Sequence, residues 1–419
     1  MNIQEFAGHS KNGADWTLAF QIAIEKLNLS GGGMLTVPSG LYPTGSIRLY
    51  SHITLNIESG ARLLFINDEE KYPLISLEFE GRNELSYRPC IYAENASFVT
   101  VKGEGVIDGQ GEFWWKQVRA KTLKHPRPRL VCFSNCDHVT VESVVLTRSP
   151  AWTVHPLRSR DVVVRSVRII NPPDSPNTDG INPDACKDVR IHDCTIDVGD
   201  DCIAIKSGTE ALDNKESCER IIITNCHFLH GHGGIVLGSE MSGGIRNVLV
   251  NGCIFYETDR GIRLKTRRGR GGTVEGIQLS NLIMEKVMCP FVFNMYYFCG
   301  PGGKEKRVWD KAPYEVDEST PRLKDVSIES VTARKCGACA AFFYGLSEMP
   351  VKRVTFKNVT IEMEDDAPAS TPAMMNDCPV MQGRGLFLRN AEDVKLENVS
   401  IYNLKGELID MDESVQIKM

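Results

Sequence analysis

The sequence predicts an all-β protein folded as a parallel β-helix, a solenoid in which each coil of the chain adds short strands to long parallel sheets. The first observation is a short motif at the start of each expected coil, in which polar residues precede Val or Ile. It recurs at steps of 23 (139 to 162) to 49 (277 to 326) residues. Repetition at about 20 to 50 residues is the sign of a solenoid. The nine starts are Asp137-His138-Val139, Arg160-Asp161-Val162, Lys187-Asp188-Val189, Glu219-Arg220-Ile221, Arg246-Asn247-Val248, Glu275-Gly276-Ile277, Lys324-Asp325-Val326, Lys352-Arg353-Val354 and Glu392-Asp393-Val394.

The second observation is a turn-forming residue four positions after the aligned Val or Ile. Residues of this kind tolerate left-handed backbone geometry and bond their local backbone, so they end short strands sharply. The residues at this position are Ser143, Ser166, Asp193, Asn225, Asn281, Ser330, Asn358 and Asn398. The two longest steps, 49 and 40 (354 to 394), predict insertions or a missed coil.

The N-terminal segment differs from the coils because residues 13–28 carry apolar residues at helical spacing. Gly31, Gly32 and Gly33 end this pattern, and a β-like run follows at 34–38. An amphipathic helix at the end of a β solenoid would cover the core and the strand edge that the terminal coil leaves open. We therefore expect one domain, with an N-terminal cap over 1–33, coils over 34–410 and a C-terminal tail over 411–419.

Composition narrows the functional class. The chain has 419 residues, a hydrophobic fraction of 42%, 36 Gly and a formal net charge of −6. A net acidic balance favours neither a nucleic acid nor a membrane surface as partner. No apolar run reaches the length of a membrane span.

The cysteines and the N-terminus predict the compartment. Three of the 14 Cys (194, 226 and 253) occupy a repeat position that Val fills in other coils, which is typical of a buried apolar slot. We expect free buried thiols and a reducing cytoplasm. The first six residues lack a basic segment followed by an apolar one, so no signal peptide is expected.

Residues 177–265 hold the chemistry. Four segments align there without gaps, and in successive coils their equivalent residues would stack about 4.8 Å apart. The segments are Asp179-Gly180-Ile181-Asn182, Asp201-Cys202-Ile203-Ala204, Gly233-Gly234-Ile235-Val236 and Arg260-Gly261-Ile262-Arg263. Strict strand alternation would point Asp201 into the core, so we expect a bend at Gly180, Cys202, Gly234 and Gly261 that leaves the acids outside.

Asp179, Asp200 and Asp201 are the candidate catalytic residues. Turn aspartates are common in β-helices, but that explanation accounts poorly for an adjacent pair beside a third acid in the neighbouring coil. Like charges this close raise the pKa of at least one carboxyl, so one can stay protonated while its neighbours are ionised. An acid for the leaving oxygen and a base for water is the pairing that glycoside hydrolysis requires. His232, between glycines 231 and 233, would orient or tune the acid.

Basic residues lie in register with these acids. Arg263 and Lys265 are two positions apart and share one strand face, and Lys206 occupies the position of Lys265 in an earlier coil. In a net acidic protein such a local cluster predicts an anionic ligand.

Four ordered motifs now carry a resemblance: Asn177-Thr178-Asp179, Gly199-Asp200-Asp201, Gly231-His232-Gly233 and Arg263-Leu264-Lys265. They resemble the signature motifs of glycoside hydrolase family 28, the polygalacturonase family, over about residues 35–410. The last motif has Leu264 where the family more often has Ile.

The resemblance implies a right-handed, pectin-lyase-like parallel β-helix that hydrolyses galacturonosyl bonds with inversion and needs neither metal nor cofactor. It implies that Asp200 is the general acid, that Asp179 and Asp201 activate water, and that His232 assists. It also implies that Arg263 and Lys265 bind the substrate carboxylate, and that either Tyr296 or Tyr297 contacts the sugar. The expected partner is an oligo- or polysaccharide containing galacturonic acid; the oligomeric state stays open.

Three alternatives remain at this point. A pectate lyase would use the acids to bind Ca²⁺ and a base to abstract a proton. A tailspike-like binding protein would carry trimer-forming or low-complexity ends, which the sequence lacks. A rhamnogalacturonan hydrolase of the same family is the nearest alternative, although the Gly-His-Gly and Arg-x-Lys motifs favour galacturonan. The aromatic-basic insertion at 110–130 and the loop at 299–322 favour exo action, because they could close one end of a groove.

Overall fold

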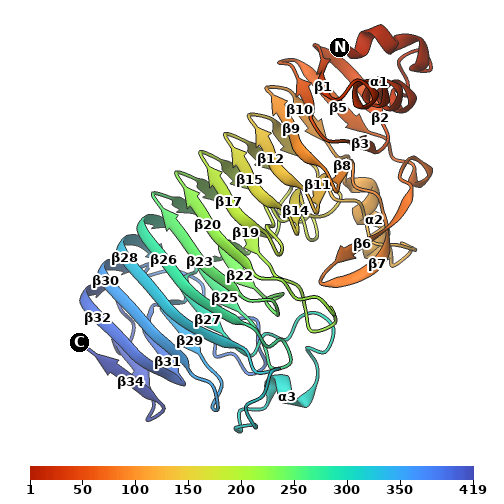
Figure 1. Ribbon diagram of the computed structural model, residues 1–419. Coiled ribbons are helices and arrows are strands. Elements are labelled where there is room, and N and C mark those ends of the chain that lie inside the picture. Colours follow the sequence, from red (N-terminus) through yellow and green to blue (C-terminus); the bar gives the residue numbers. More distant parts are fainter. The chain divides into compact units, whose positions relative to one another are not determined.

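The computed structural model describes residues 1–419, and the chain divides into two compact units, Met1–Asp200 and Asp201–Met419. Both units are built from rows of parallel strands, one strand of each row per coil (Figure 1). A chain that returns to the same row after each coil is a parallel β-helix, as the repeats predict. No helix of the structure is both long and apolar enough to span a membrane.

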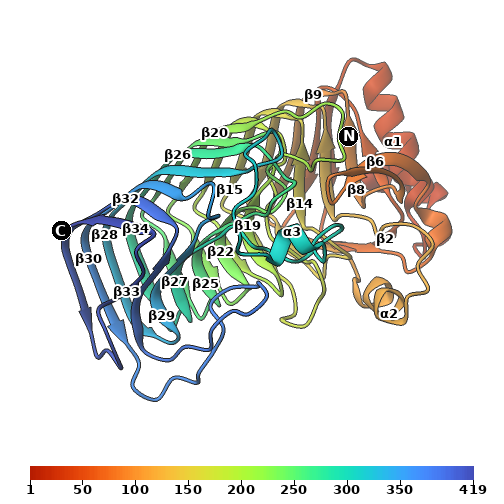
Figure 2. The same ribbon diagram turned by 90° about the horizontal axis from the view of Figure 1, so that it is seen from below.

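Two helices begin the first unit. They are the 3₁₀ helix η1 (Ile3–His9) and α1 (Thr17–Leu29). Helix α1 matches the helix predicted at 13–28, and it packs against the first coil (Figure 2). Its residues Phe20, Ile24 and Leu27 are buried. Three glycines with positive φ, Gly31 to Gly33, follow its end. Such residues end helices readily because glycine adopts this conformation without strain.

The strands of the first unit form three parallel rows. The first row is β1 (Gly33–Val37), β4 (Ile53–Ile57), β9 (Ser97–Gly103), β12 (Asp137–Glu142), β15 (Arg160–Arg165) and β17 (Lys187–His192). The second row is β2 (Gly40–Thr44), β5 (Ala61–Phe65), β10 (Val106–Asp108), β13 (Val145–Thr147), β16 (Arg168–Ile170) and β18 (Thr195–Asp197). The third row is β3 (Ile47–Leu49), β8 (Ile91–Glu94), β11 (Val131–Ser134) and β14 (Val154–Leu157).

Four further elements of this unit lie outside the rows. Strands β6 (Leu74–Phe79) and β7 (Arg82–Tyr87) form an antiparallel hairpin that follows the 3₁₀ helix η2 (Glu69–Lys71). Helix α2 (Glu112–Ala120) lies within the predicted insertion at 110–130.

The second unit repeats the three rows. The first is β20 (Cys218–Thr224), β23 (Ile245–Asn251), β26 (Thr273–Glu285), β28 (Arg322–Cys336), β30 (Val351–Met363), β32 (Ala391–Tyr402) and β34 (Val415–Lys418). The second is β21 (His227–Leu229) and β24 (Ile254–Tyr256), and it continues in the second halves of β26 to β32. The third is β19 (Asp201–Ile205), β22 (Gly233–Gly238), β25 (Arg260–Lys265), β27 (Cys289–Asn294), β29 (Cys339–Tyr344), β31 (Arg384–Arg389) and β33 (Ile409–Met411). A short helix, α3 (Lys306–Trp309), lies in the loop after β27.

Strand register within each unit confirms the sequence repeat. Val139 pairs with Val162 and Val162 with Val189 in the first unit. Every successive aligned position from Ile221 to Val394 pairs in the second. The long steps are therefore insertions within single coils, placed after β27 and after β30. Strand β34 pairs with β32, so the coils continue past residue 410, into the segment expected to be a tail.

Left-handed residues at fixed places end the short strands. All eight Asn, Asp and Ser residues predicted to turn the chain have φ between 53° and 62°. The middle residue of each of the nine strand starts is also left-handed, with φ from 49° (Asp161) to 68° (Gly276). The Cys slot is buried as predicted, since Cys194, Cys226 and Cys253 are at most 2% exposed.

Candidate active site

The third row of the second unit places Asp201. Asp201 pairs with Gly233, and Ile203, Ile235 and Ile262 follow one another in register, so the three segments of this unit align as the sequence predicts. A Cβ atom on Gly233 would approach the Asp201 carboxylate, whereas one on Gly234 would meet the core residue Phe255. Because Ile235 also faces the core, two consecutive residues point inward. The predicted bend is therefore present, and the Asp201 carboxylate lies on the outer side of the sheet.

Two cations hold the Asp201 carboxylate. Lys265 Nζ donates to Oδ2 at 2.7 Å, and Arg263 Nη1 donates to Oδ1 at 3.4 Å. All three residues are at least 93% buried. Burial alone would raise the pKa of Asp201, but the charges of Lys265 and Arg263 outweigh it and hold the pKa well below its ordinary value. Asp201 is therefore held in its ionised form, in which it can accept a hydrogen bond from water.

Lys206 has its own acidic partner. Its Nζ lies 2.8 Å from Glu240 Oε2, and both residues are buried. Burial would raise the pKa of Glu240, and the Lys206 charge lowers it instead. Lys206 also contributes to the low pKa of Asp201. The structure thus adds Glu240 to the residues predicted from the sequence.

His232 is more than half exposed, and its Nδ1 lies 2.9 Å from Asp259 Oδ2. Burial raises the pKa of Asp259, but His232 and Arg260 together lower it. An ionised carboxylate at Nδ1 fixes the ring orientation and directs Nε2 away from Asp259. The neighbouring Arg260 donates through Nε to Pro372 O at 2.9 Å.

The two candidate tyrosines occupy different surroundings. Tyr297 lies beside the cations, with Lys265 Nζ 5.2 Å and Arg263 Cζ 5.6 Å from its ring centroid. Tyr296 is fully buried, and Lys311 Nζ lies 3.4 Å from its ring centroid. Burial raises the pKa of Tyr296 to about 12. Of the two, Tyr297 is the one that adjoins the Asp201 cluster.

In the first unit, Asp179 is buried and accepts a hydrogen bond from Asn182 Nδ2 at 2.7 Å. Asp200 is partly exposed and ends this unit. Arg127 binds the motif around Asp179, because it donates to Asn177 Oδ1 and Pro176 O at 2.7 Å each. Burial lowers the pKa of Arg127 to about 10, and Glu80, Asp179 and Asp200 limit the drop.

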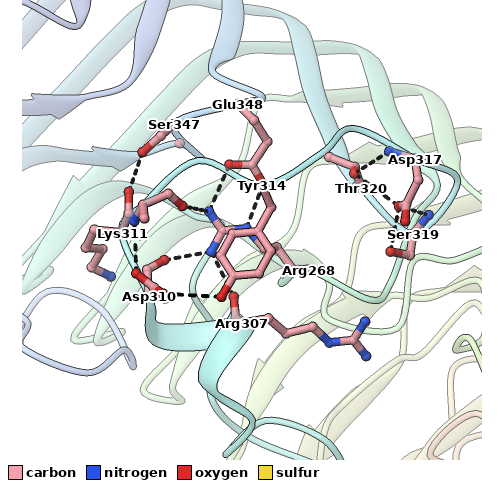
Figure 3. Close-up of polar contacts among 12 residues, drawn as sticks. Arg268, Arg307, Asp310, Lys311, Tyr314, Asp317, Ser319, Thr320, Ser347 and Glu348 are labelled. Atoms are coloured by element: carbon pink, nitrogen blue, oxygen red, sulfur yellow. Dashed lines mark hydrogen bonds and ion pairs between the residues drawn. The ribbon is translucent and has the colours of Figure 1, made fainter.

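The loop predicted at 299–322 is fixed to the scaffold by Arg268 (Figure 3). Arg268 forms a two-pronged ion pair with Glu348, at 2.6 and 2.8 Å, and donates to three loop carbonyls. Its guanidinium also lies 4.5 Å from the Tyr314 ring centroid. This anchoring holds Lys311 against Tyr296, and burial lowers the pKa of Lys311 to about 8. Arg268 is 4% exposed, and its contacts are structural.

Sequence reasoning missed Arg127, Glu240 and Asp259 as neighbours of the predicted residues. Arg127 lies in the insertion already singled out, so its basic composition was a usable signal. Asp259 directly precedes the aligned Arg260, which marks its place in the coil. Nothing local marks Glu240, because its partner Lys206 is more than 30 residues away.

The charges beside Asp201 argue against a calcium-dependent lyase. The Lys265 ammonium occupies the position beside Asp201 in which a bound Ca²⁺ would lie. The positive charges of Lys265 and Arg263 would also repel Ca²⁺.

A parallel β-helix that carries an ionised outer-face aspartate, the two other acids of the sequence motifs and an exposed histidine has the fold and groups of a glycosidase. The chain belongs to the glycosyl hydrolases family 28, whose model matches residues 75–379. The fold is accordingly the right-handed parallel β-helix, and the protein is a glycosidase.

Relatives and solved structures agree with this assignment. A probable polygalacturonase of Vitis vinifera is 33% identical over 374 residues, which cover 86% of this chain and 74% of that protein. An exopolygalacturonase from Thermotoga maritima aligns with a TM-score of 0.80 and 29% identity over 96% of this chain and 91% of that one. A family 28 exopolygalacturonase of Yersinia enterocolitica shares the fold, with a TM-score of 0.81 at 18% identity over 100% of this chain and 78% of that one.

Proposed function

We propose that the protein hydrolyses α-1,4-galacturonosyl linkages of galacturonan and its oligomers, with exo action and inversion at the anomeric carbon. Support comes from family membership and from the names of its relatives, a probable polygalacturonase and an exopolygalacturonase. The observation that carries the proposal is the Asp201 carboxylate, held ionised by Lys265 and Arg263.

In the proposed mechanism, Asp200 protonates the oxygen of the leaving sugar, because it is the most exposed of the three acids. Asp201 and Asp179 accept hydrogen bonds from the attacking water, and one of them takes its proton. The exposed His232, oriented by Asp259, assists the acid. In inverting enzymes acid and base are usually about 6.5–9.5 Å apart, which leaves room for the water.

Arg263 and Lys265 would serve a second purpose at the same site. Ammonium and guanidinium groups carry several N–H donors, so each side chain can hold Asp201 and also bind the carboxylate of the galacturonate. A substrate carboxylate would bind beside Lys265 and Arg263, whose two positive charges exceed the single negative charge of Asp201. Tyr297 would then flank the sugar, since it packs beside both cations.

Exo action is supported by the β6–β7 hairpin of the first unit. Ile75 and Leu77 pack against Tyr92, Cys132 and Leu157, which lie on the third row. At the end of β6, Phe79 stacks on Trp152 with ring centroids 5.1 Å apart.

Trp152 shows how far along the sheet face the β6–β7 hairpin reaches. It immediately precedes Thr153, whose backbone N–H donates to Asp179 O. The sheet face is therefore covered up to the coil that adjoins Asp179, and a sugar chain would have little room to continue there.

Time-resolved product analysis of a defined oligogalacturonide tests the function. We expect monogalacturonate from the first turnover and an inverted anomer as the first-formed sugar in an NMR spectrum. An early mixture of oligomers would refute exo action, a retained anomer would refute the assigned roles, and an unsaturated product would identify a lyase instead.

A reducing compartment is the remaining part of the proposal. It is supported by the burial of 12 of the 14 cysteines, all present as thiols.

A further inference from the structure

A loop of the second unit, residues 364–383 between β30 and β31, is bound to the strands that carry the predicted substrate-binding residues. Arg260, at the start of β25, donates from Nε to Pro372 O at 2.9 Å and from Nη2 to Thr371 O at 3.2 Å. The Arg260 side chain is 8% exposed, so a buried side chain, not a mobile surface one, holds the loop.

Met374 contacts Arg263, one of the two cations that hold Asp201. Its Sδ lies 3.0 Å from Arg263 Nη2, and its carbonyl accepts from Asn294 Nδ2 at 3.2 Å. The strand neighbours of Arg263 and Asn294, such as Leu264 and Phe293, are fully buried. Arg263 and Asn294 consequently face outward, and Met374 covers the outer face of the sheet where β25 meets β27.

The loop is ordered by its own contacts. Ser370 and Met381 exchange two backbone hydrogen bonds of 2.9 Å, and Gln382 Nε2 donates to Ala367 O at 2.6 Å. The loop is therefore ordered by its own hydrogen bonds without a bound substrate. We expect it to block a long ligand rather than move aside.

Its chemistry also opposes a long polyanion. At Met374 a further galacturonosyl residue would meet a thioether and a carbonyl oxygen, neither of which can donate a hydrogen bond to a carboxylate. The loop contributes four acids, Glu364, Asp365, Asp366 and Asp377, and no basic residue. From β19, which carries Asp201, to β27 there are three steps of the row, or about 14 Å of sheet face at the strand spacing.

We propose that the 364–383 loop, with Met374 at its inner end, closes the sheet face beyond Lys265 and makes the enzyme specific for short galacturonides. Met374 is a specificity-determining residue, and Arg260 is a positioning residue that acts through the loop. This inference rests on the proposed hydrolysis of galacturonosyl bonds. A thioether is a weak acceptor, so Arg263 Nη2 stays available for the carboxylate of a short substrate.

The test is kcat/KM for the series from digalacturonate to hexagalacturonate. For the wild type we expect the highest values for di- and trigalacturonate and a fall of about tenfold or more by the hexamer. Met374→Ala should raise kcat/KM for the hexamer by about tenfold and change that for the dimer less than about threefold. Met411→Ala, at an exposed methionine of β33, is the matched control and should leave the whole series unchanged.

Two results would overturn the inference: a wild-type kcat/KM that is constant or rises with length, or a Met374→Ala effect equal for all lengths. Arg260→Lys provides a second variant, because it keeps the charge but loses the two-pronged contact with the loop. It should raise the ratio of hexamer to dimer kcat/KM, and an unchanged ratio would contradict the positioning role. Failure of the wild type to hydrolyse any galacturonide would instead refute the proposed function itself.

Discussion

At the scale of single residues, the protonation state of Asp201 is set by its two cationic neighbours. The sequence led us to expect mutual repulsion among three acids, which raises the pKa of at least one of them. For Asp201 the pKa shift has the opposite direction, because Lys265 and Arg263 hold the pKa low. Asp201 is thus kept ionised, and in this form it can accept a hydrogen bond from a water molecule.

The first residue-scale prediction concerns Asp200. Asp200→Asn keeps the shape of the side chain but removes the proton that the leaving oxygen needs, so kcat should fall by about 10² to 10⁴. Binding of a galacturonide, measured by calorimetry, should change little. Asp213→Asn, at an exposed loop aspartate, is the control. A kcat within threefold of the wild type would remove Asp200 from the acid role.

The second concerns pH. The pKa of Asp201 is depressed, so the stability that its ionised form contributes is fully present above the ordinary carboxyl pKa of about 3.9. This stability is lost only as pH falls through the lowered pKa. Lys265→Met removes the larger compensating charge, and burial should then raise this pKa. The acid limb of the kcat/KM profile should move to higher pH, and kcat/KM should fall at least tenfold because a carboxylate partner is lost.

The control for the pH experiment is Lys357→Met, which breaks an exposed ion pair with Glu329. Its profile should superimpose on that of the wild type. Superimposed acid limbs for Lys265→Met and the wild type would contradict the assigned role of Lys265.

At the scale of elements, strand ends depend on residues in the left-handed conformation, one of which is Ser330 between the two halves of β28. This conformation costs a residue with a side chain about 1–2 kcal/mol, and branching at Cβ adds to the strain. The repeat at these positions was visible in the sequence because only a few residue types tolerate such a backbone.

Ser330→Val should therefore lower the free energy of unfolding by about 1–2 kcal/mol, whereas Ser330→Gly should maintain or raise it. Ser327→Val, in the same strand but at an extended position, is the matched control and should be neutral or mildly stabilising. Denaturant midpoints measured under reducing conditions check all three. Equal midpoints for the two valine variants would show that backbone strain at Ser330 is unimportant.

At the scale of the whole molecule, the cysteines report on packing. Twelve of the 14 are buried, and Cys299 and Cys378 are partly exposed. Burial raises the pKa of Cys132, for example, to about 12, which leaves almost no thiolate to react at neutral pH.

Titration of the native protein with a thiol reagent should thus detect at most the two partly exposed cysteines, and titration after unfolding should detect all 14. Cys299→Ser and Cys378→Ser should each remove one fast-reacting thiol. A total below 14 in the unfolded, unreduced protein would reveal disulfides and argue against a reducing compartment.

The sequence by itself determined the class of fold and the stacking of the key segments. Short-range periodicity suffices for this, because each coil repeats the same turns and the same buried positions. The alignment of Asp201 with Gly233, and the bend that keeps the acid outside, followed from glycine placement and from the cost of burying a lone carboxylate.

The tertiary structure alone decided which charges meet and where the sheet face is covered. Lys265 reaches Asp201 from 64 residues away, and Met374 reaches Arg263 from 111. The periodic signal places the bases in register with the acids, but the Lys265 contact also depends on side-chain conformation. The Met374 contact depends on an insertion that does not repeat. The choice between Tyr296 and Tyr297 was open for the same reason: they are adjacent in the chain, and only packing separates one buried under Lys311 from one beside Arg263 and Lys265.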